Sequence, residues 1–204
     1  MIKNVIFDVG NVLVRWSPPE VICRCFQHAP ESDENSRRVK DVFHSASWKQ
    51  LNLGKLTQAE VEMAWQTECG LTAEEARSLF FHVTDHQILI EGTDALACRL
   101  KAAGYRIFAL TDNVREIVAF LKERHTFWDI FEGIVVSAEV GMLKPDPAIF
   151  RYTLEKFGLA AEETVFIDDY PRNVDGAASV GIQARLFTTA VRCEEDLRDL
   201  GLVF

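Results

Sequence analysis

The sequence predicts an α/β fold in which a parallel β-sheet forms the core and a small helical bundle is inserted after the first strand. Three observations support this prediction. The apolar run at residues 5–7 lacks the alternation of a half-exposed strand, as expected of a parallel strand that is covered on both faces. Residues 19–90 show only helical patterns. From residue 91 onwards, apolar runs alternate with helical patterns, which is typical of βαβ units.

The helical insert, residues 17–87, is expected to form a cap domain that lies over the sheet. Two helix starts inside it show the spacing of a capping box, Thr57 with Glu60 and Thr72 with Glu75. The remaining residues, 1–16 and 88–204, are expected to form the core domain.

The core domain is predicted to continue as a series of strands and helices. Strands are expected at residues 105–110, 133–137, 164–167 and 183–187. Helices are expected at residues 93–103, 114–125, 147–157, 173–180 and 194–200. This alternation predicts parallel neighbouring strands joined by right-handed crossovers.

The composition excludes several classes of partner. A net charge of −9 over 204 residues argues against binding to nucleic acids or anionic membranes. No apolar run approaches the roughly 20 residues of a membrane span, and the N-terminus does not have the pattern of a signal peptide. The five cysteines are an odd number without a regular spacing, which favours reduced thiols and a cytoplasmic location. We expect a monomer or a weak homodimer.

Polar residues follow three of the expected strands. Asp8 ends the first strand, Thr111 and Asp112 end another, and Asp168 and Asp169 end a third. Because the carboxyl ends of parallel strands share one edge of a sheet, these side chains are expected to lie together where open α/β sheets bind ligands. Each of these residues alone is also common at an ordinary strand end or helix start, so the argument depends on their shared position.

The charges of this cluster favour phosphate chemistry. Up to three carboxylates in one cleft are costly unless they are compensated. Lys144, on a loop stiffened by Pro145 and Pro147, offsets one of them, and a Mg²⁺ ion offsets the others. A magnesium site beside a nucleophilic carboxylate suits phosphoryl transfer, with attack by Asp8 on phosphorus and with Thr111 holding phosphate oxygens. The expected partner is therefore a small phosphorylated metabolite.

Four segments of the chain resemble the motifs of the haloacid dehalogenase (HAD) superfamily, in order and in spacing. They are FDVGNVLV, ALTDN, GMLKPDPAIF and VFIDDYPRNVDGA. The resemblance covers nearly the whole chain and is closest to subgroup I, which carries a helical cap after the first motif. It implies a Rossmann-like core and hydrolase activity.

The resemblance also implies roles for individual residues. The implied catalytic residues are Asp8 as the nucleophile, Thr111 and Lys144. The residues expected to contact substrate are Asn11, Thr111, Asp112, Asn113, Lys144 and the cap residue Trp48. The implied Mg²⁺ ligands are Asp8, the carbonyl of Gly10, Asp168 and Asp169, with Asn173 and Asp175 in support.

The chain departs from the family pattern at Gly10, where phosphatases of this superfamily usually carry a second aspartate that acts as general acid and base. One interpretation is a phosphatase that resembles the branch with sugar-1-phosphate phosphatases, in which the leaving group, the substrate or a cap residue such as His44 compensates. A second is a 2-haloacid dehalogenase, whose halide leaves without a proton, although Asp168 and Asp169 do not match its metal-free site. A third is a HAD-like binding protein without turnover.

Substrate choice is expected to depend on the polar and aromatic stretch at residues 47–54. Trp48 is expected to stack on a sugar ring and Asn52 to bond hydroxyl groups, with the core of the helical bundle as the alternative position for Trp48. Arg15 and Trp16 are further candidates for the mouth of the cleft.

Overall fold

A five-stranded parallel sheet forms the centre of the molecule, and the predicted α/β fold is confirmed. The computed structural model describes residues 1–27, 29 and 31–204. Within these residues the strand order is β3-β2-β1-β4-β5. The strands are β1 (Asn4–Phe7), β2 (Arg106–Thr111), β3 (Gly133–Val136), β4 (Thr164–Asp168) and β5 (Gln183–Leu186).

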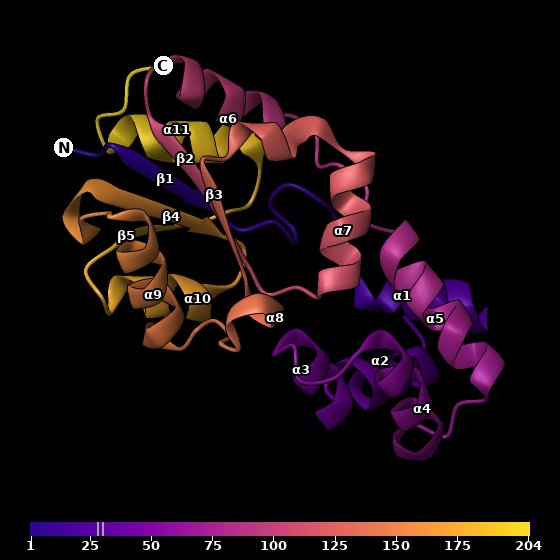
Figure 1. Cartoon of the computed structure of the whole chain (residues 1–204). Coiled ribbons are helices and arrows are strands. Elements are labelled where there is room, and N and C mark those ends of the chain that lie inside the picture. The colour runs from indigo at the N-terminus through magenta and orange to yellow at the C-terminus, as the bar shows by residue number, and fades with distance from the viewer. Residues whose placement is uncertain (28, 30) are drawn as a thin grey trace.

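Helices cover both faces of the sheet and form a separate group at one end (Figure 1). The inserted helices are α1 (Pro18–Phe26), α2 (Asp33–Phe43), α3 (Ala46–Asn52), α4 (Gln58–Glu68) and α5 (Ala73–Asp85). The helices around the sheet are α6 (Thr93–Ala102), α7 (Arg115–Arg124), α8 (Ser137–Val140), α9 (Pro147–Phe157), α10 (Pro171–Ala178) and α11 (Ala190–Asp199). Two 3₁₀ turns, η1 (Thr126–Ile130) and η2 (Ala161–Glu163), complete the described elements.

The side chains of β1 show why this segment reads as a continuous apolar run. Val5 and Phe7 belong to a core cluster that includes residues of α6 and α11, whereas Ile6 faces the opposite cluster beneath α9 and α10. All three are fully buried. Burial on both faces removes the need for polar residues at alternate positions, which accounts for the sequence pattern.

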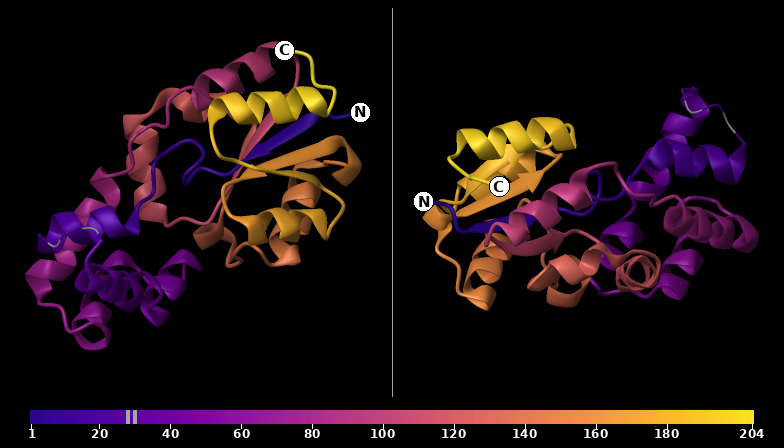
Figure 2. Two further views of the ribbon diagram at one scale, coloured as in Figure 1. Left: turned by 180° about the vertical axis from the view of Figure 1, so that it is seen from behind. Right: turned by 90° about the horizontal axis from the view of Figure 1, so that it is seen from above.

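The helical insert (α1–α5) lies at the end of the sheet away from the two termini (Figures 1 and 2). The two segments that connect it to the sheet run side by side. The Arg15 amide donates to the Ile88 carbonyl at 2.7 Å, and the Ile90 amide donates to the Leu13 carbonyl at 2.8 Å. Both connections therefore enter the insert at one place.

Capping and aromatic packing hold the helical insert together. The expected capping boxes are present at Thr57 with Glu60 and at Thr72 with Glu75. Each N-cap contributes about 1 kcal/mol to helix stability. The fully buried Trp65 lies at the centre of the insert and belongs to the same hydrophobic cluster as the β1 residues Val5 and Phe7.

Several boundaries differ from the sequence-based expectation. The last helix begins at Ala190, because Thr189 caps it, and α10 begins at Pro171, which occupies a first-turn position. The short elements η1 and α8 had no counterpart in the prediction, since neither is long enough to show a helical period.

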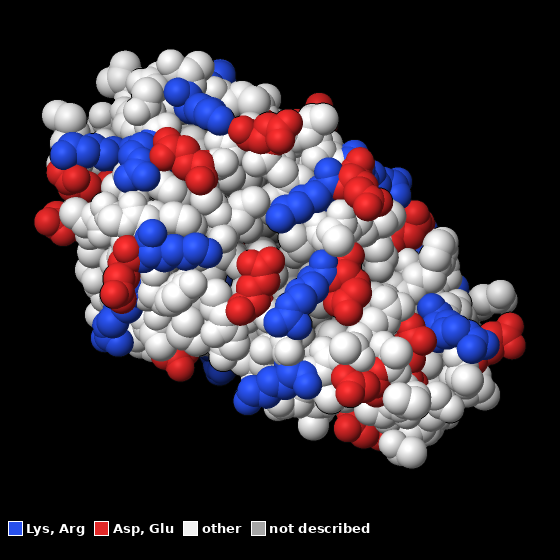
Figure 3. Space-filling view, viewed as in Figure 1, with Lys and Arg blue, Asp and Glu red and all other residues white. Residues whose placement is uncertain are grey.

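Charged side chains of both signs are spread over the surface. Basic and acidic side chains alternate over the face shown in Figure 3, with no broad basic patch on it. Within the described part of the chain, no helix combines the length and the apolar character needed to cross a bilayer. All five cysteines are free thiols.

Candidate active site

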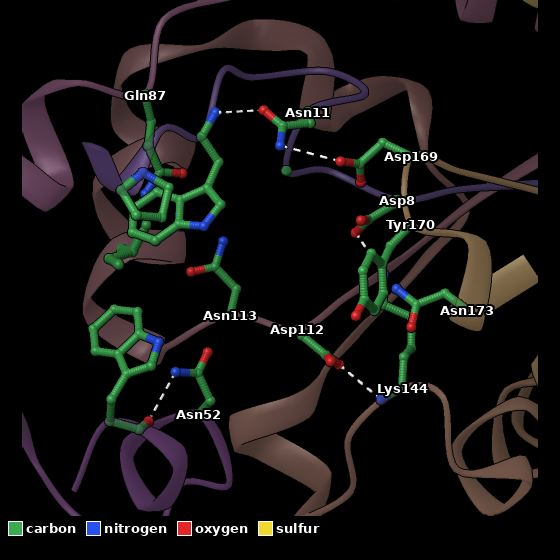
Figure 4. A pocket seen from close by; sticks show the side chains of 15 residues that line it. Asp8, Asn11, Asn52, Gln87, Asp112, Asn113, Lys144, Asp169, Tyr170 and Asn173 are labelled. Carbon is green, nitrogen blue, oxygen red and sulfur yellow. Dashed lines mark hydrogen bonds and ion pairs between the residues drawn. The ribbon is translucent and has the colours of Figure 1, made fainter. Parts of the chain in front are cut away.

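The carboxyl ends of β1, β2 and β4 meet at a pocket of about 440 Å³ that reaches to the helical insert. The strand order changes direction beside β1, which is the usual ligand position in open α/β sheets. The pocket residues labelled in Figure 4 are Asp8, Asn11, Asn52, Gln87, Asp112, Asn113, Lys144, Asp169, Tyr170 and Asn173.

Lys144 is the central cation of the site. Its ammonium lies 2.8 Å from Asp8 Oδ1 and 2.7 Å from Asp168 Oδ2, and it also donates to the Leu110 carbonyl at 3.3 Å. The Lys144 side chain is 1% exposed and that of Asp168 is fully buried. A buried ammonium with three oxygen partners is held in one position, which the predicted stiff loop also favours.

One lysine faces several carboxylates, so the site carries an excess of negative charge. Burial raises the pKa of Asp8 well above its usual value. The positive charge of Lys144 lowers this pKa, and the negative charge of Asp168 raises it further. Burial also raises the pKa of Asp169, and it raises that of Asp112 to about 6. Burial alone would lower the pKa of Lys144, but attraction to Asp8, Asp168 and Asp112 outweighs it and raises that pKa. Lys144 therefore stays charged while the acids lack a full set of counter-charges.

The acidic cluster fits a magnesium ion. Asp8, Asp168 and Asp169 each offer a carboxylate oxygen, and these oxygens lie within 4.8 Å of one another. Hard oxygen ligands on one or two carboxylates are what Mg²⁺ prefers. The uncompensated negative charge gives such an ion a strong electrostatic reason to bind. Gly10 lines the same pocket, consistent with its expected place near the cation.

The turn after β1 is shaped by Asn11. Its backbone is left-handed, with φ of 52°, whereas Gly10 has no positive φ, so Asn11 is the left-handed residue of this turn. Asn11 Nδ2 donates to Asp169 Oδ2 at 3.1 Å, and its Oδ1 accepts from the Trp16 amide at 2.8 Å. Asparagine tolerates this conformation and ties the turn to Asp169 through its side chain.

The segment that follows β2 contributes two residues to the wall of the pocket. Thr111 is the last residue of β2, is 1% exposed, and does not line the pocket. Asp112 and Asn113, the next two residues, do line it. Asp112 Oδ1 accepts from the Lys144 amide at 3.1 Å, and the Asn113 amide donates to Ser137 Oγ at 3.0 Å.

The fourth motif holds Asp168 in place. Asn173 Nδ2 lies 3.0 Å from both carboxylate oxygens of Asp168, and the Tyr170 amide donates to Asp168 Oδ1 at 2.8 Å. The expected supporting position of Asn173 is therefore beside the acidic cluster. Asp175 is exposed on α10 and lies outside the pocket.

The helical insert forms the outer wall. Trp48 lines the pocket and also packs in the bundle, stacked on Trp16 with centroids 6.1 Å apart and on Trp65 at 6.0 Å, so both alternatives for its position hold at once. Asn52 lines the same wall. His44, the suggested proton source, is exposed at the end of α2 and lies outside the pocket.

Three polar residues of the site were not identified from the sequence. Gln87 and Tyr170 line the pocket, and Ser137 bridges the segment after β2 to the insert. Trp16 lies on the first connection to the insert and Gln87 on the second, and the two connections run side by side. Once the insert was recognised, this topology could have indicated that Gln87 lies near Trp16 at the pocket. Nothing in the local sequence marks Tyr170 or Ser137.

The fold and this acidic pocket define an α/β enzyme in which strand-end carboxylates gather around a buried lysine and a cation site. Residues 2–181 match the family model described as haloacid dehalogenase-like hydrolase. The chain therefore belongs to the haloacid dehalogenase-like hydrolases, which confirms the resemblance seen in its motifs.

Similar proteins support the same assignment. The chain is 28% identical over 198 residues to the sesquiterpene phosphatase astK of Aspergillus oryzae, covering 97% of this chain and 96% of that protein. It is 26% identical over 195 residues to D-ribitol-5-phosphate phosphatase of Bacteroides thetaiotaomicron, covering 90% of each. The fold is similar, with a TM-score of 0.77 and 22% identity over 93% of this chain and 96% of the other, to a HAD family enzyme of the same bacterium in complex with magnesium and inorganic phosphate.

Proposed function

We propose that this protein is a Mg²⁺-dependent phosphatase that hydrolyses small phosphorylated metabolites through an aspartyl-phosphate on Asp8. The observation that carries the proposal is the contact of Lys144 with both Asp8 and Asp168 beside the third acid, Asp169. This arrangement offers a nucleophile, a fixed positive charge and a cation site in one pocket. The two full-length relatives are named as phosphatases, which supports the same reaction.

The proposed reaction begins with attack on phosphorus by a carboxylate oxygen of Asp8, and water then hydrolyses the acyl phosphate. Lys144 neutralises the phosphate and orients Asp8 through its ion pair. Thr111 directly precedes the pocket residues Asp112 and Asn113, and its hydroxyl group is proposed to hold a phosphate oxygen when substrate binds. A Mg²⁺ ion on Asp8, Gly10, Asp168 and Asp169 would supply further neutralisation of the phosphate charge.

The outer pocket favours a hydroxylated substrate. Asn52 donates its amide nitrogen to the Trp48 carbonyl at 2.9 Å, and Gln87 donates its own to the Val83 carbonyl at 3.2 Å. No described residue donates to the amide oxygens of these two side chains, which leaves them to accept hydrogen bonds from a ligand. Amide acceptors next to indole surfaces suit a sugar or sugar-alcohol phosphate better than a hydrocarbon chain.

We further propose that residues 17–87 form a cap domain on the core of residues 1–16 and 88–204. The paired connections and the wall that the insert adds to the pocket support this division. Movement of the cap would then exclude water from the reaction. The five free thiols favour a cytoplasmic location, and we propose a monomer or a weak homodimer.

The acidic pair favours phosphatase over dehalogenase chemistry. Asp168 and Asp169 beside Asp8 would weaken it as a nucleophile unless a cation compensates them. A protein that only bound its ligand would not need a nucleophilic carboxylate positioned by a buried lysine.

Release of nitrophenol from p-nitrophenyl phosphate, measured with Mg²⁺ and with a chelator, tests the proposed reaction. We expect turnover that disappears in the chelator and returns when Mg²⁺ is restored. Halide release from 2-chloropropionate serves as the parallel assay. Turnover of the haloacid without turnover of the phosphate ester would overturn the proposal.

A further inference from the structure

The pocket has to supply a proton to the leaving oxygen and later remove one from water, yet Gly10 and Asn11 cannot titrate. Resting on the proposed phosphatase function, we propose that Asp112 is the general acid and base of this site. The proposal names a catalytic residue at a position expected only to contact substrate.

The titratable groups that line the pocket leave few candidates. Asp8 and Lys144 are paired with each other, and Asp169 is bonded to Asn11 and belongs to the acidic cluster. Tyr170 is half exposed, and its polar group is a phenol rather than a carboxyl group. Among the described pocket residues, Asp112 is the one remaining carboxyl group.

The position of Asp112 in the pocket wall suits proton transfer to the leaving group. It follows Thr111 at the end of β2, so it starts beside the proposed phosphate position, and it precedes Asn113, which is tied through Ser137 to the helical insert. The leaving group of an in-line displacement points away from Asp8, toward the insert. Figure 4 shows the Asp112 side chain between Asn113 and Lys144, in the wall of the same pocket as Asp8.

The hydrogen bonds of Asp112 leave one oxygen available. Oδ1 accepts from the Lys144 amide at 3.1 Å, and no described residue donates to Oδ2. The bond to Lys144 fixes the carboxyl group without consuming the atom that would carry the proton. An asparagine can keep this bond, because its carbonyl oxygen can replace Oδ1.

Burial and the charged groups around Asp112 give it a pKa that suits a general acid and base. Burial raises the pKa of Asp112 to about 6, Lys144 lowers it, and Asp168 raises it. Asp8, Asp169 and Tyr170 share the pocket with it. A general acid and base works best when its pKa lies near the working pH.

The proposed proton transfers balance over the cycle. As Asp8 bonds to phosphorus and the ester bond breaks, the proton of the Asp112 carboxyl group passes to the leaving oxygen and gives the alcohol. The Asp112 carboxylate then takes a proton from water as the water oxygen attacks phosphorus. Inorganic phosphate and the free Asp8 carboxylate are released, and Asp112 is protonated again.

The test compares Asp112→Asn with wild type on p-nitrophenyl phosphate and on phenyl phosphate, whose leaving group is more basic. The measured quantity is kcat/KM, which reports the steps up to departure of the leaving group. General acid catalysis is typically worth about 10²–10⁴-fold, so we expect a loss of about 100-fold or more on phenyl phosphate and of less than about fivefold on p-nitrophenyl phosphate. Retained nitrophenol release also shows that the variant is folded.

The matched control is Tyr170→Phe, which removes the other uncommitted titratable group of the pocket. We expect it to keep the wild-type ratio between the two esters. An equal loss on both esters in Asp112→Asn would assign Asp112 to binding and overturn the proposal. A changed ratio in Tyr170→Phe alone would overturn it as well.

The wild-type pH profile gives a second test that needs no variant. A general acid must be protonated, so kcat/KM for phenyl phosphate should fall as the pH rises through the pKa of Asp112, while that for p-nitrophenyl phosphate falls less. Parallel profiles would contradict the proposal. Absence of any wild-type turnover would instead overturn the phosphatase function itself, so the two failures are distinguishable.

Discussion

At the scale of single residues, the site places its carboxylates where they are costly. Lys144 contacts Asp8 and Asp168, Asp169 lies beside these two acids, and Asp112 lies in the wall of the same pocket. Functional groups held in this way commonly reduce stability, because the fold has to keep charges where solvent does not compensate them.

Replacement of Asp112 by asparagine should therefore stabilise the metal-free protein at neutral pH. A carboxyl group whose pKa is higher in the folded than in the unfolded state favours folding below its unfolded value, and this advantage is lost as the pH rises through its folded value of about 6. We expect Asp112→Asn to gain about 1–3 kcal/mol in the free energy of unfolding at pH 7 and little at pH 4. Urea unfolding in a chelator at the two pH values measures this, and an equal effect at both would contradict it.

Single residues also show where prediction from sequence succeeds and where it fails. Asp8, Lys144 and Asp168 were predicted to meet, and they do, because strand ends in a parallel sheet share one edge. The role of Asn11 in the turn was missed, since backbone φ depends on the tertiary contacts with Trp16 and Asp169. The catalytic, binding and metal roles remain predictions.

At the scale of elements, the end of α3 and the turn that follows it form one of the contacts between the insert and the core. Ser137 Oγ donates to the Asn52 carbonyl at 2.8 Å, and Arg115 donates to the Gly54 carbonyl at 3.3 Å. A Cβ on Gly54 would lie 1.9 Å from the Ala138 carbonyl oxygen, so the contact with α8 requires glycine.

A comparison of Gly54→Ala with Gly70→Ala should distinguish the effect of losing the contact with α8 from the effect of backbone strain. Gly70 is the matched control, because its φ of +67° is close to the +68° of Gly54 but nothing lies within 4 Å of its added Cβ. Both substitutions should cost about 1–2 kcal/mol through the left-handed backbone. Only Gly54→Ala should also displace the pocket wall and lower kcat/KM for p-nitrophenyl phosphate by on the order of tenfold to 10²-fold. Equal kinetics in the two variants would show that the contact with α8 does not position the site.

The elements themselves were largely predictable. The strands and most helices follow from apolar periodicity and from the capping residues at Thr57 and Thr72. The short α8 and η1 were not, because they form where tertiary contacts hold only one or two turns of chain. Trp48 and Asn52 were predicted to line the pocket wall, but Gln87 was not. Gln87 reaches the wall because the two segments that connect the insert to the sheet run side by side.

At the scale of the whole molecule, the sheet and the helical insert close around one acidic pocket. Residues far apart in the chain, Asp8, Lys144 and Asp168, meet there only in the native fold. A cation that binds this pocket therefore binds the native state and stabilises the whole chain.

Mg²⁺ should accordingly raise the temperature of unfolding. An ion present at 100 times its dissociation constant stabilises the native state by about 2.7 kcal/mol. Asp169→Asn should reduce the shift, because it removes one carboxylate of the cluster. Asp129→Asn, which changes an exposed carboxylate on η1, should keep it. Calorimetry at increasing Mg²⁺ concentration measures both, and an equal shift in all three proteins would place the cation elsewhere.

The central claim is that Asp8 carries out the hydrolysis of a phosphate ester beside a bound cation. The most direct measurement is nitrophenol release from p-nitrophenyl phosphate in Mg²⁺ by wild type, Asp8→Asn and the surface control Asp129→Asn. We predict that turnover is lost in Asp8→Asn and is unchanged in Asp129→Asn, with thermal unfolding showing that both variants are folded. Turnover by a folded Asp8→Asn variant at the wild-type rate would contradict this account.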